Sequence, residues 1–133
     1  MAAKSYTHDN NVIDFFLRNN PGAIASPATV YVGLFTVAPA NPGDAGTEVD
    51  PMGTAYERKA AMFTAPANGA TSNMAGVTFD AATASWGTVV AAGIWDADMA
   101  GTLLYYGLLG ANKTIDMGDT ASFAAGQLSV TEQ

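Results

Sequence analysis

The stretch that most constrains the fold is a pair of apolar segments, residues 88–95 and 102–109, separated by Asp96-Ala-Asp-Met-Ala-Gly101. Asp and Gly residues between two such segments are typical of a hairpin turn. Both faces of the first segment are apolar: one carries Val90, Ala92 and Ile94, and the other carries Val89, Ala91, Gly93 and Trp95. A strand of this kind is normally central and covered on each side. We therefore expect a buried β-hairpin at the centre of the core.

Turn signals at intervals of roughly 8 to 12 residues divide most of the chain into about eight short strand-like segments. This spacing predicts an all-β fold, an antiparallel β-sandwich or jelly roll. We expect two units, an N-terminal helix or arm over residues 1–26 and a β-sandwich domain over residues 27–133. The expected strands cover residues 28–37, 56–63, 74–79, 88–95, 102–109, 113–117, 120–123 and 128–131.

Residues 5–19 predict a short α-helix. Ser5, Thr7 and Asp9 are candidate N-caps, and Asn19-Asn-Pro-Gly22 is a stop signal. A helix of about this length is marginal alone in water, so we expect it to dock through its apolar side chains. It could cap the open end of the sandwich or reach a neighbouring subunit. The apolar side chains at helical spacing are Val12, Ile13, Phe15, Phe16 and Leu17.

Residues 38–54 contain three prolines, three glycines and three acidic residues, and we expect an extended surface loop. A loop this long is uncommon in a compact domain unless it contacts something, so it is the first candidate for a functional contact. The alternative is a mobile connector. Its acidic residues, Asp44, Glu48 and Asp50, could also form a weak Ca²⁺ site.

The charge balance argues against two classes of partner. The chain has 5 Lys and Arg against 12 Asp and Glu, and no basic residue lies between Lys59 and Lys113. Nucleic acid and anionic membranes both require basic groups, so we expect neither as a partner. We find no apolar run of about 20 residues and no secretion signal. The absence of cysteine fits synthesis in a reducing cytoplasm.

The sequence offers little reactive chemistry. His8 is its only histidine, and no G-x-S-x-G motif is present. Asp96, Asp98 and Gly101 copy the opening of a calcium loop, but Ala100 and Gly107 cannot supply the remaining ligands. We therefore expect no enzyme, no catalytic residue, no metal site and no cofactor. Paired carboxylates for glycoside hydrolysis remain an open alternative, because their separation depends on the fold.

Six segments, in their order and spacing, are similar to a family of small tailed-bacteriophage virion structural proteins, often labelled tail-fibre-like. The block from SWGTV to LLYYG is the most specific, and Tyr56-Glu-Arg-Lys59 stands where family members usually have Tyr-Ala-Arg-Gln. The segments are VYVGLFTVAP (30–39), GTEV (46–49), YERKA (56–60), TSNMAGVTFDAATASWGTVVAAGIWDA (71–97), LLYYG (103–107) and GDTASFAAGQLSVT (118–131).

Together with the scarcity of chemistry, this resemblance implies a capsid decoration, or cement, protein that stabilises the major capsid protein lattice. The expected partners are the major capsid protein and further copies of the chain, as a dimer or trimer. The expected location is the capsid exterior of the virion, and the host cytoplasm during assembly. One alternative is a tail, baseplate or fibre-associated structural component, and another is a carbohydrate-binding module on the virion.

Interface energy usually concentrates in a few large side chains, with Trp, Tyr and Arg prominent among them. Each of the aromatic and Arg candidates could equally belong to the core, and for Trp86 and Tyr105 we expect the core. The candidate interface residues are Phe15, Phe16, Asp44, Glu48, Asp50, Arg58, Trp95 and Tyr106.

Overall fold

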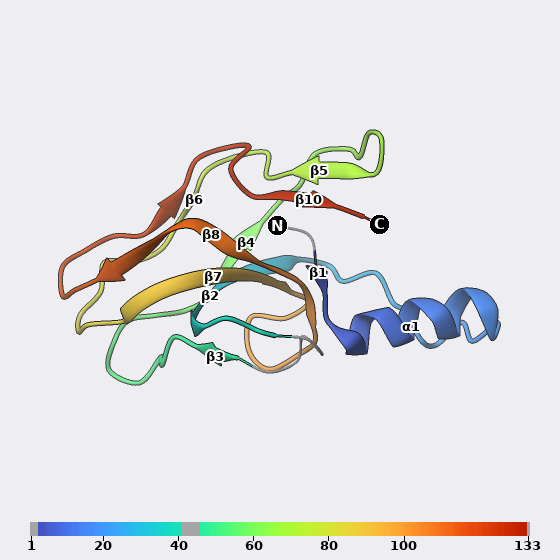
Figure 1. The fold of residues 1–133 in the computed structure, drawn as a ribbon, viewed down its shortest axis with the longest axis horizontal. Helices are drawn as coiled ribbons and strands as arrows, with labels where there is room; N and C mark the ends of the chain where they lie inside the picture. Colours follow the sequence, from blue (N-terminus) through green and yellow to red (C-terminus); the bar gives the residue numbers. More distant parts are fainter. Residues whose placement is uncertain (1–2, 41–45, 133) are drawn as a thin grey trace.

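The computed structural model describes residues 3–40 and 46–132, which form two antiparallel β layers and an N-terminal helix (Figure 1). The all-β sandwich with a short helix is therefore confirmed. The elements in these residues are β1 (Ala3–Lys4), α1 (Tyr6–Leu17), β2 (Val30–Val37), β3 (Thr47–Glu48), β4 (Lys59–Ala61), β5 (Ala70–Ser72), β6 (Val77–Thr78), β7 (Gly87–Trp95), β8 (Leu103–Ile115), β9 (Ser122–Phe123) and β10 (Ser129–Thr131).

The larger layer is a six-stranded sheet with the order β1-β8-β7-β2-β3, in which β4 also pairs with β2. Strands β3 and β4 share one edge of β2, because β3 pairs near Phe35 and β4 pairs near Tyr31. Two small ladders, β10-β5 and β6-β9, contribute to the second layer. β7 lies between β2 and β8, so the expectation of a central, doubly covered strand is confirmed.

The second half of the hairpin differs from the prediction. We expected separate strands over residues 102–109 and 113–117, but β8 is one strand of 13 residues. Its pairing with β7 passes from Ala91–Leu108 to Val89–Lys113, so the four residues 109–112 lie opposite Val90 alone and bulge out of the ladder. A bulge lets a strand absorb an irregular stretch without ending.

The alternation of faces along β7 also changes at this bulge. Val89 and Ala92 belong to the main core cluster, whereas Ala91 belongs to a second cluster and Val90 packs against that second cluster. Strict alternation would place Val89 and Ala91 on the same face. Val89 faces the main core with Ala92, and Val90 faces the second cluster with Ala91. The predicted division of β7 into two faces is therefore wrong at these two valines.

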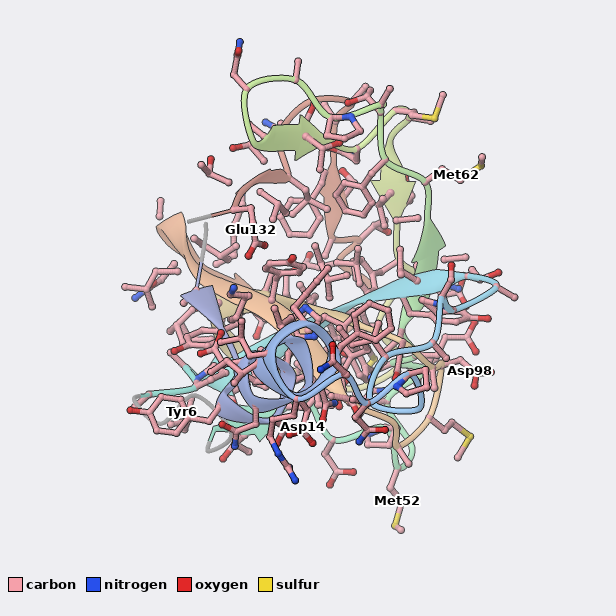
Figure 2. The ribbon with its side chains drawn as sticks, turned by 90° about the vertical axis from the view of Figure 1, so that its right-hand side faces the viewer. Tyr6, Asp14, Met52, Met62, Asp98 and Glu132 are labelled. Carbon is pink, nitrogen blue, oxygen red and sulfur yellow. The ribbon has the colours of Figure 1, made fainter. Side chains whose placement is uncertain are left out.

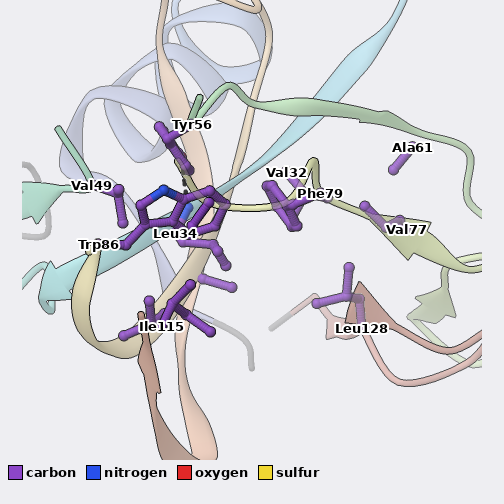
Figure 3. Close-up of a cluster of buried hydrophobic side chains, with 13 residues drawn as sticks. Val32, Leu34, Val49, Tyr56, Ala61, Val77, Phe79, Trp86, Ile115 and Leu128 are labelled. Carbon is purple, nitrogen blue, oxygen red and sulfur yellow. Dashed lines mark hydrogen bonds between the residues drawn. The ribbon is translucent and has the colours of Figure 1, made fainter. Parts of the chain in front are cut away.

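The main core lies between the two layers (Figure 3). At its centre, the Tyr56 ring stacks on Phe79 and meets Trp86 edge-on, at centroid distances of 6.2 and 5.3 Å. Trp86 is 4% exposed, which confirms the prediction that it is a core residue, and its indole N–H donates to the Thr54 carbonyl at 2.8 Å. The buried members are Val32, Leu34, Val49, Tyr56, Ala61, Val77, Phe79, Ala82, Trp86, Val89, Ala92, Ile115 and Leu128.

Several short strands differ from the prediction. β1 was not expected, β3 lies within the predicted loop of residues 38–54, and β5 lies in a stretch that we interpreted as turns. The strand expected over residues 56–63 is reduced to β4. Strands of two or three residues carry too little local pattern to be recognised, because they exist only where a neighbouring edge is available for pairing.

Helix α1 begins and ends where the sequence predicted. Ser5 is the N-cap, and its hydroxyl accepts from the His8 N–H at 3.1 Å. The Arg18 N–H bonds to the Asp14 carbonyl, and Asn19 has a φ of 56°, which ends the helix. None of its residues, all of which the structure describes, is buried. In Figure 1 the C-terminal half of α1 extends beyond the sandwich, so it does not cap the open end.

Candidate functional site

Three of the predicted interface residues meet in the folded chain. Glu48 lies in β3, Arg58 directly precedes β4, and Trp95 ends β7. Arg58 Nε donates to Glu48 Oε2 and Nη2 donates to Oε1, both at 2.8 Å. The Arg58 side chain is only 7% exposed, so this two-pronged ion pair is largely removed from water. We call Glu48, Tyr56, Arg58 and Trp95 the Arg58 cluster.

Arg58 also holds the turn of the central hairpin. Its Nη1 donates to the carbonyls of Ala97 and Ala100 at 3.0 and 2.8 Å, and its Cζ lies 3.7 Å from the centroid of the Trp95 ring. A guanidinium suits this position because it presents several donors in one plane and stacks on aromatic faces. Asp96 closes the turn by accepting from the Thr102 N–H at 2.7 Å, so residues 96–101 form a hairpin connection.

Sequence reasoning missed the role of Tyr56. Its hydroxyl donates to Glu48 Oε2 at 2.7 Å and accepts from the Leu34 N–H at 2.9 Å. Burial and the bond to Glu48 raise the pKa of Tyr56 far above its usual value, so the phenol stays protonated and acts as a donor.

Gly33 makes room for this cluster. A Cβ at position 33 would lie 2.8 Å from Glu48 Oε2 and 2.9 Å from the Tyr56 hydroxyl, closer than side chains normally approach. A glycine inside a strand often marks such a close approach. The glycine between Val32 and Leu34 is therefore the sequence signal of this cluster.

The Arg58 cluster links separate segments of the chain. Its charged and hydroxyl groups bond to one another and to the backbone. The Trp95 indole N–H is buried and has no hydrogen-bond partner within the described residues. These internal contacts account for Glu48 and Arg58 without an external partner.

The other predicted interface residues are scattered. Tyr106, on β8, packs against the second apolar cluster, which contains Phe35, Ala91 and Leu103. Asp50 is exposed and accepts from the Met52 N–H at 2.9 Å, which orders a turn. Asp44 lies outside the described residues. Across residues 3–40 and 46–132, no group of three or more His, Cys, Asp or Glu is placed to hold a metal ion.

A polar contact joins the two ends of the chain. Glu132 accepts from Lys4 Nζ at 2.5 Å and from the Tyr105 hydroxyl at 2.6 Å. Burial alone would raise the pKa of Glu132, but these two hydrogen bonds and the Lys4 charge outweigh it and lower that pKa. The same contact raises the pKa of Lys4. We call Lys4, Tyr105 and Glu132 the terminal clasp.

The only histidine lies beside this clasp. The His8 ring meets the Tyr105 ring edge-on at a centroid distance of 5.4 Å. Burial, followed by the nearby Lys4 charge, lowers the pKa of His8. The contacts of His8 are those of a packing residue at the base of the helix.

Large exposed apolar side chains occur in two settings. On α1, Ile13, Phe16 and Leu17 are 50%, 67% and 76% exposed. Exposed methionines also lie outside the helix, and Figure 2 shows Met52 and Met62 pointing away from the body. A groove of about 700 Å³ runs between β8 and residues 119–129, and its lining includes Leu34, Val89 and Leu128 of the core.

The fold and the two polar clusters define a class, a small β-sandwich protein whose polar clusters link distant parts of its own chain. No helix in the described residues is long and apolar enough to cross a membrane. Residues 3–131 match the family described as Podophage GP4 fiber I protein gp80. The chain belongs to this family, and it is a structural protein of a tailed-phage virion. Among curated proteins, no match was found.

Proposed function

We propose that this chain is a tail-associated structural component of the virion, a fibre or fibre-attachment module that acts by binding other virion proteins. The observation that carries the proposal is the family match over residues 3–131, because the family is described by a fibre protein. The fold supports it. The charged and hydroxyl groups of the Arg58 cluster are engaged within the chain, whereas apolar side chains on α1 are exposed.

The capsid decoration role that we predicted from the sequence is less well supported. It requires binding to the major capsid protein lattice, whereas the family description names a fibre. The scarcity of charge, 13% of residues, would suit either role, because both demand contact with other proteins.

Copy number and position in the virion separate the two roles. Quantitative mass spectrometry of purified particles should find about 3 to 18 copies, the small multiples that tail symmetry allows. Labelled antibodies viewed by electron microscopy should mark the tail. Hundreds of copies spread over the head would overturn the tail proposal in favour of decoration.

A further inference from the structure

Helix α1 carries an apolar stripe that the described chain leaves open. Ile13, Phe16 and Leu17 are at least half exposed, and they lie within one turn of each other on one side of the helix. Val12 and Phe15, on the other side, are half-buried. A helix that is apolar on two sides is normally covered on both. We therefore expect another protein to cover the side of α1 that carries Ile13, Phe16 and Leu17.

The position of the stripe makes it accessible. It occupies the C-terminal half of α1, which extends beyond the sandwich in Figure 1. The Phe15 and Phe16 rings meet edge-on at a centroid distance of 4.9 Å, so a half-buried ring supports the exposed one. A partner can reach Phe16 and Leu17 without contacting the sheets.

The charge distribution indicates what that partner is. Residues 1–26 contain two basic residues, Lys4 and Arg18, and two acidic residues, Asp9 and Asp14, so this part is neutral. Residues 27–133 contain three basic and ten acidic residues and carry the whole net charge of −7. Two sandwiches repel each other, and the neutral arm is where two copies can meet with the least repulsion.

We propose that α1 is a contact between two copies of this chain, which pack their apolar stripes together antiparallel across a twofold axis near Ile13. This arrangement opposes the two helix dipoles. A twofold contact is self-complementary, so one stripe suffices for both copies.

Sedimentation of the full chain over a range of concentrations tests this contact. The unmodified protein should form dimers. Phe16→Gln and Leu17→Gln should each raise the dimer dissociation constant by at least about tenfold, because each removes a buried apolar side chain. Leu108→Gln is the matched control, since Leu108 on β8 is 73% exposed, and it should leave the constant unchanged. Added salt should not weaken the dimer, because it screens the repulsion between the acidic sandwiches.

Cross-linking locates the axis, and the chain has no cysteine to interfere. Ile13→Cys should form a disulfide-linked dimer on oxidation, and Met117→Cys, at a more exposed position outside the helix, should not. A monomer at high concentration, equal weakening by Leu108→Gln, or a dimer that Ile13→Cys does not cross-link would overturn the proposal. So would a monomer that binds virion particles through Phe16, since the stripe would then serve another protein. These experiments use the isolated chain, whereas the tail location is tested on whole virions. A negative result for the dimer would therefore not change the proposal that the protein is tail-associated.

Discussion

Arg58 and Arg18 both pair with a carboxylate, but their surroundings differ. Arg58 is 7% exposed, holds Glu48 with two donors, reaches two carbonyls of the hairpin turn and covers the Trp95 ring. Arg18 is 73% exposed and bonds to Asp14 on the preceding helical turn. The number of partners and the loss of water, not the residue type, separate a structural arginine from a surface one.

The aromatic residues of these two regions differ in the same way. Phe35 and Trp95 stack at a centroid distance of 6.1 Å within the second apolar cluster, and Phe35 is 4% exposed. The Phe15–Phe16 pair is closer, at 4.9 Å, yet Phe16 is 67% exposed. The sheet region uses its large side chains to stabilise the fold, whereas the arm leaves them available for binding.

Of the polar clusters, the Arg58 cluster should contribute most to stability. Arg58→Ala should lower the free energy of unfolding by about 3 kcal/mol, because it leaves the Glu48 carboxylate without its cation and frees two turn carbonyls. Arg18→Ala, the matched control, should cost less than about 0.5 kcal/mol. Urea unfolding followed by tryptophan fluorescence measures both. Equal losses would mean that the two regions do not differ as described.

Gly33→Ala should cost about 2 kcal/mol, because the added methyl group overlaps the Glu48 and Tyr56 oxygens and must push them apart. Gly110→Ala is the control, since a Cβ there meets nothing within 4 Å. The same urea experiment compares them. If Gly33→Ala were as harmless as Gly110→Ala, the cluster would be looser than these distances indicate.

The terminal clasp should make stability depend on pH in the acid range. The pKa of Glu132 is lower in the folded chain than its ordinary value of 4.5, so its contribution is present above that value and is lost as the pH falls through the folded pKa. The effect should stay below about 1 kcal/mol, because solvent screens a side chain that is 47% exposed.

Comparing the unmodified chain with Glu132→Gln at pH 7 and pH 3 isolates this contribution. The two proteins should differ in stability at pH 7, and the difference should shrink as the pH falls from 4.5 toward 3. A difference that persists at pH 3 would show that the Glu132 charge is not its source.

The smallest effect is expected on the arm. Phe16→Ser, measured at low protein concentration, should change the free energy of unfolding by less than about 0.5 kcal/mol, because its ring is already mostly in water. Phe79→Ser, in the main core at 2% exposure, should cost about 4 kcal/mol. A large loss for Phe16→Ser would make α1 part of the core and remove the contrast between the two regions.

Several features were predictable because their signals are local. Ser5 and the Asn19-Asn-Pro-Gly22 stop bracket α1, and the Asp and Gly residues of the hairpin turn separate β7 from β8. The apolar run of β7 predicted a central strand. Each signal lies within a few residues of the element it specifies.

The short strands and the Arg58 cluster were not predictable in this way. β1 and β3 form only because β8 and β2 offer an edge, and β8 continues past residue 109 only because β7 holds both sides of its bulge. Arg58 and Trp95 had two interpretations each, interface or core, and Glu48 lay in a stretch that we expected to be a surface loop. These three residues lie far apart in the sequence, so only the pairing of the strands decides whether they meet inside the protein.

The sequence alone determined the β-rich class, the helix boundaries and the central hairpin, because caps, turns and apolar periodicity act over short range. It also indicated the family, through the order and spacing of similar segments. Only the tertiary structure decided that Arg58 faces inward and Phe16 faces outward. An arginine or a phenylalanine is compatible with either environment, and the energy that decides between them comes from the groups that the fold brings around it.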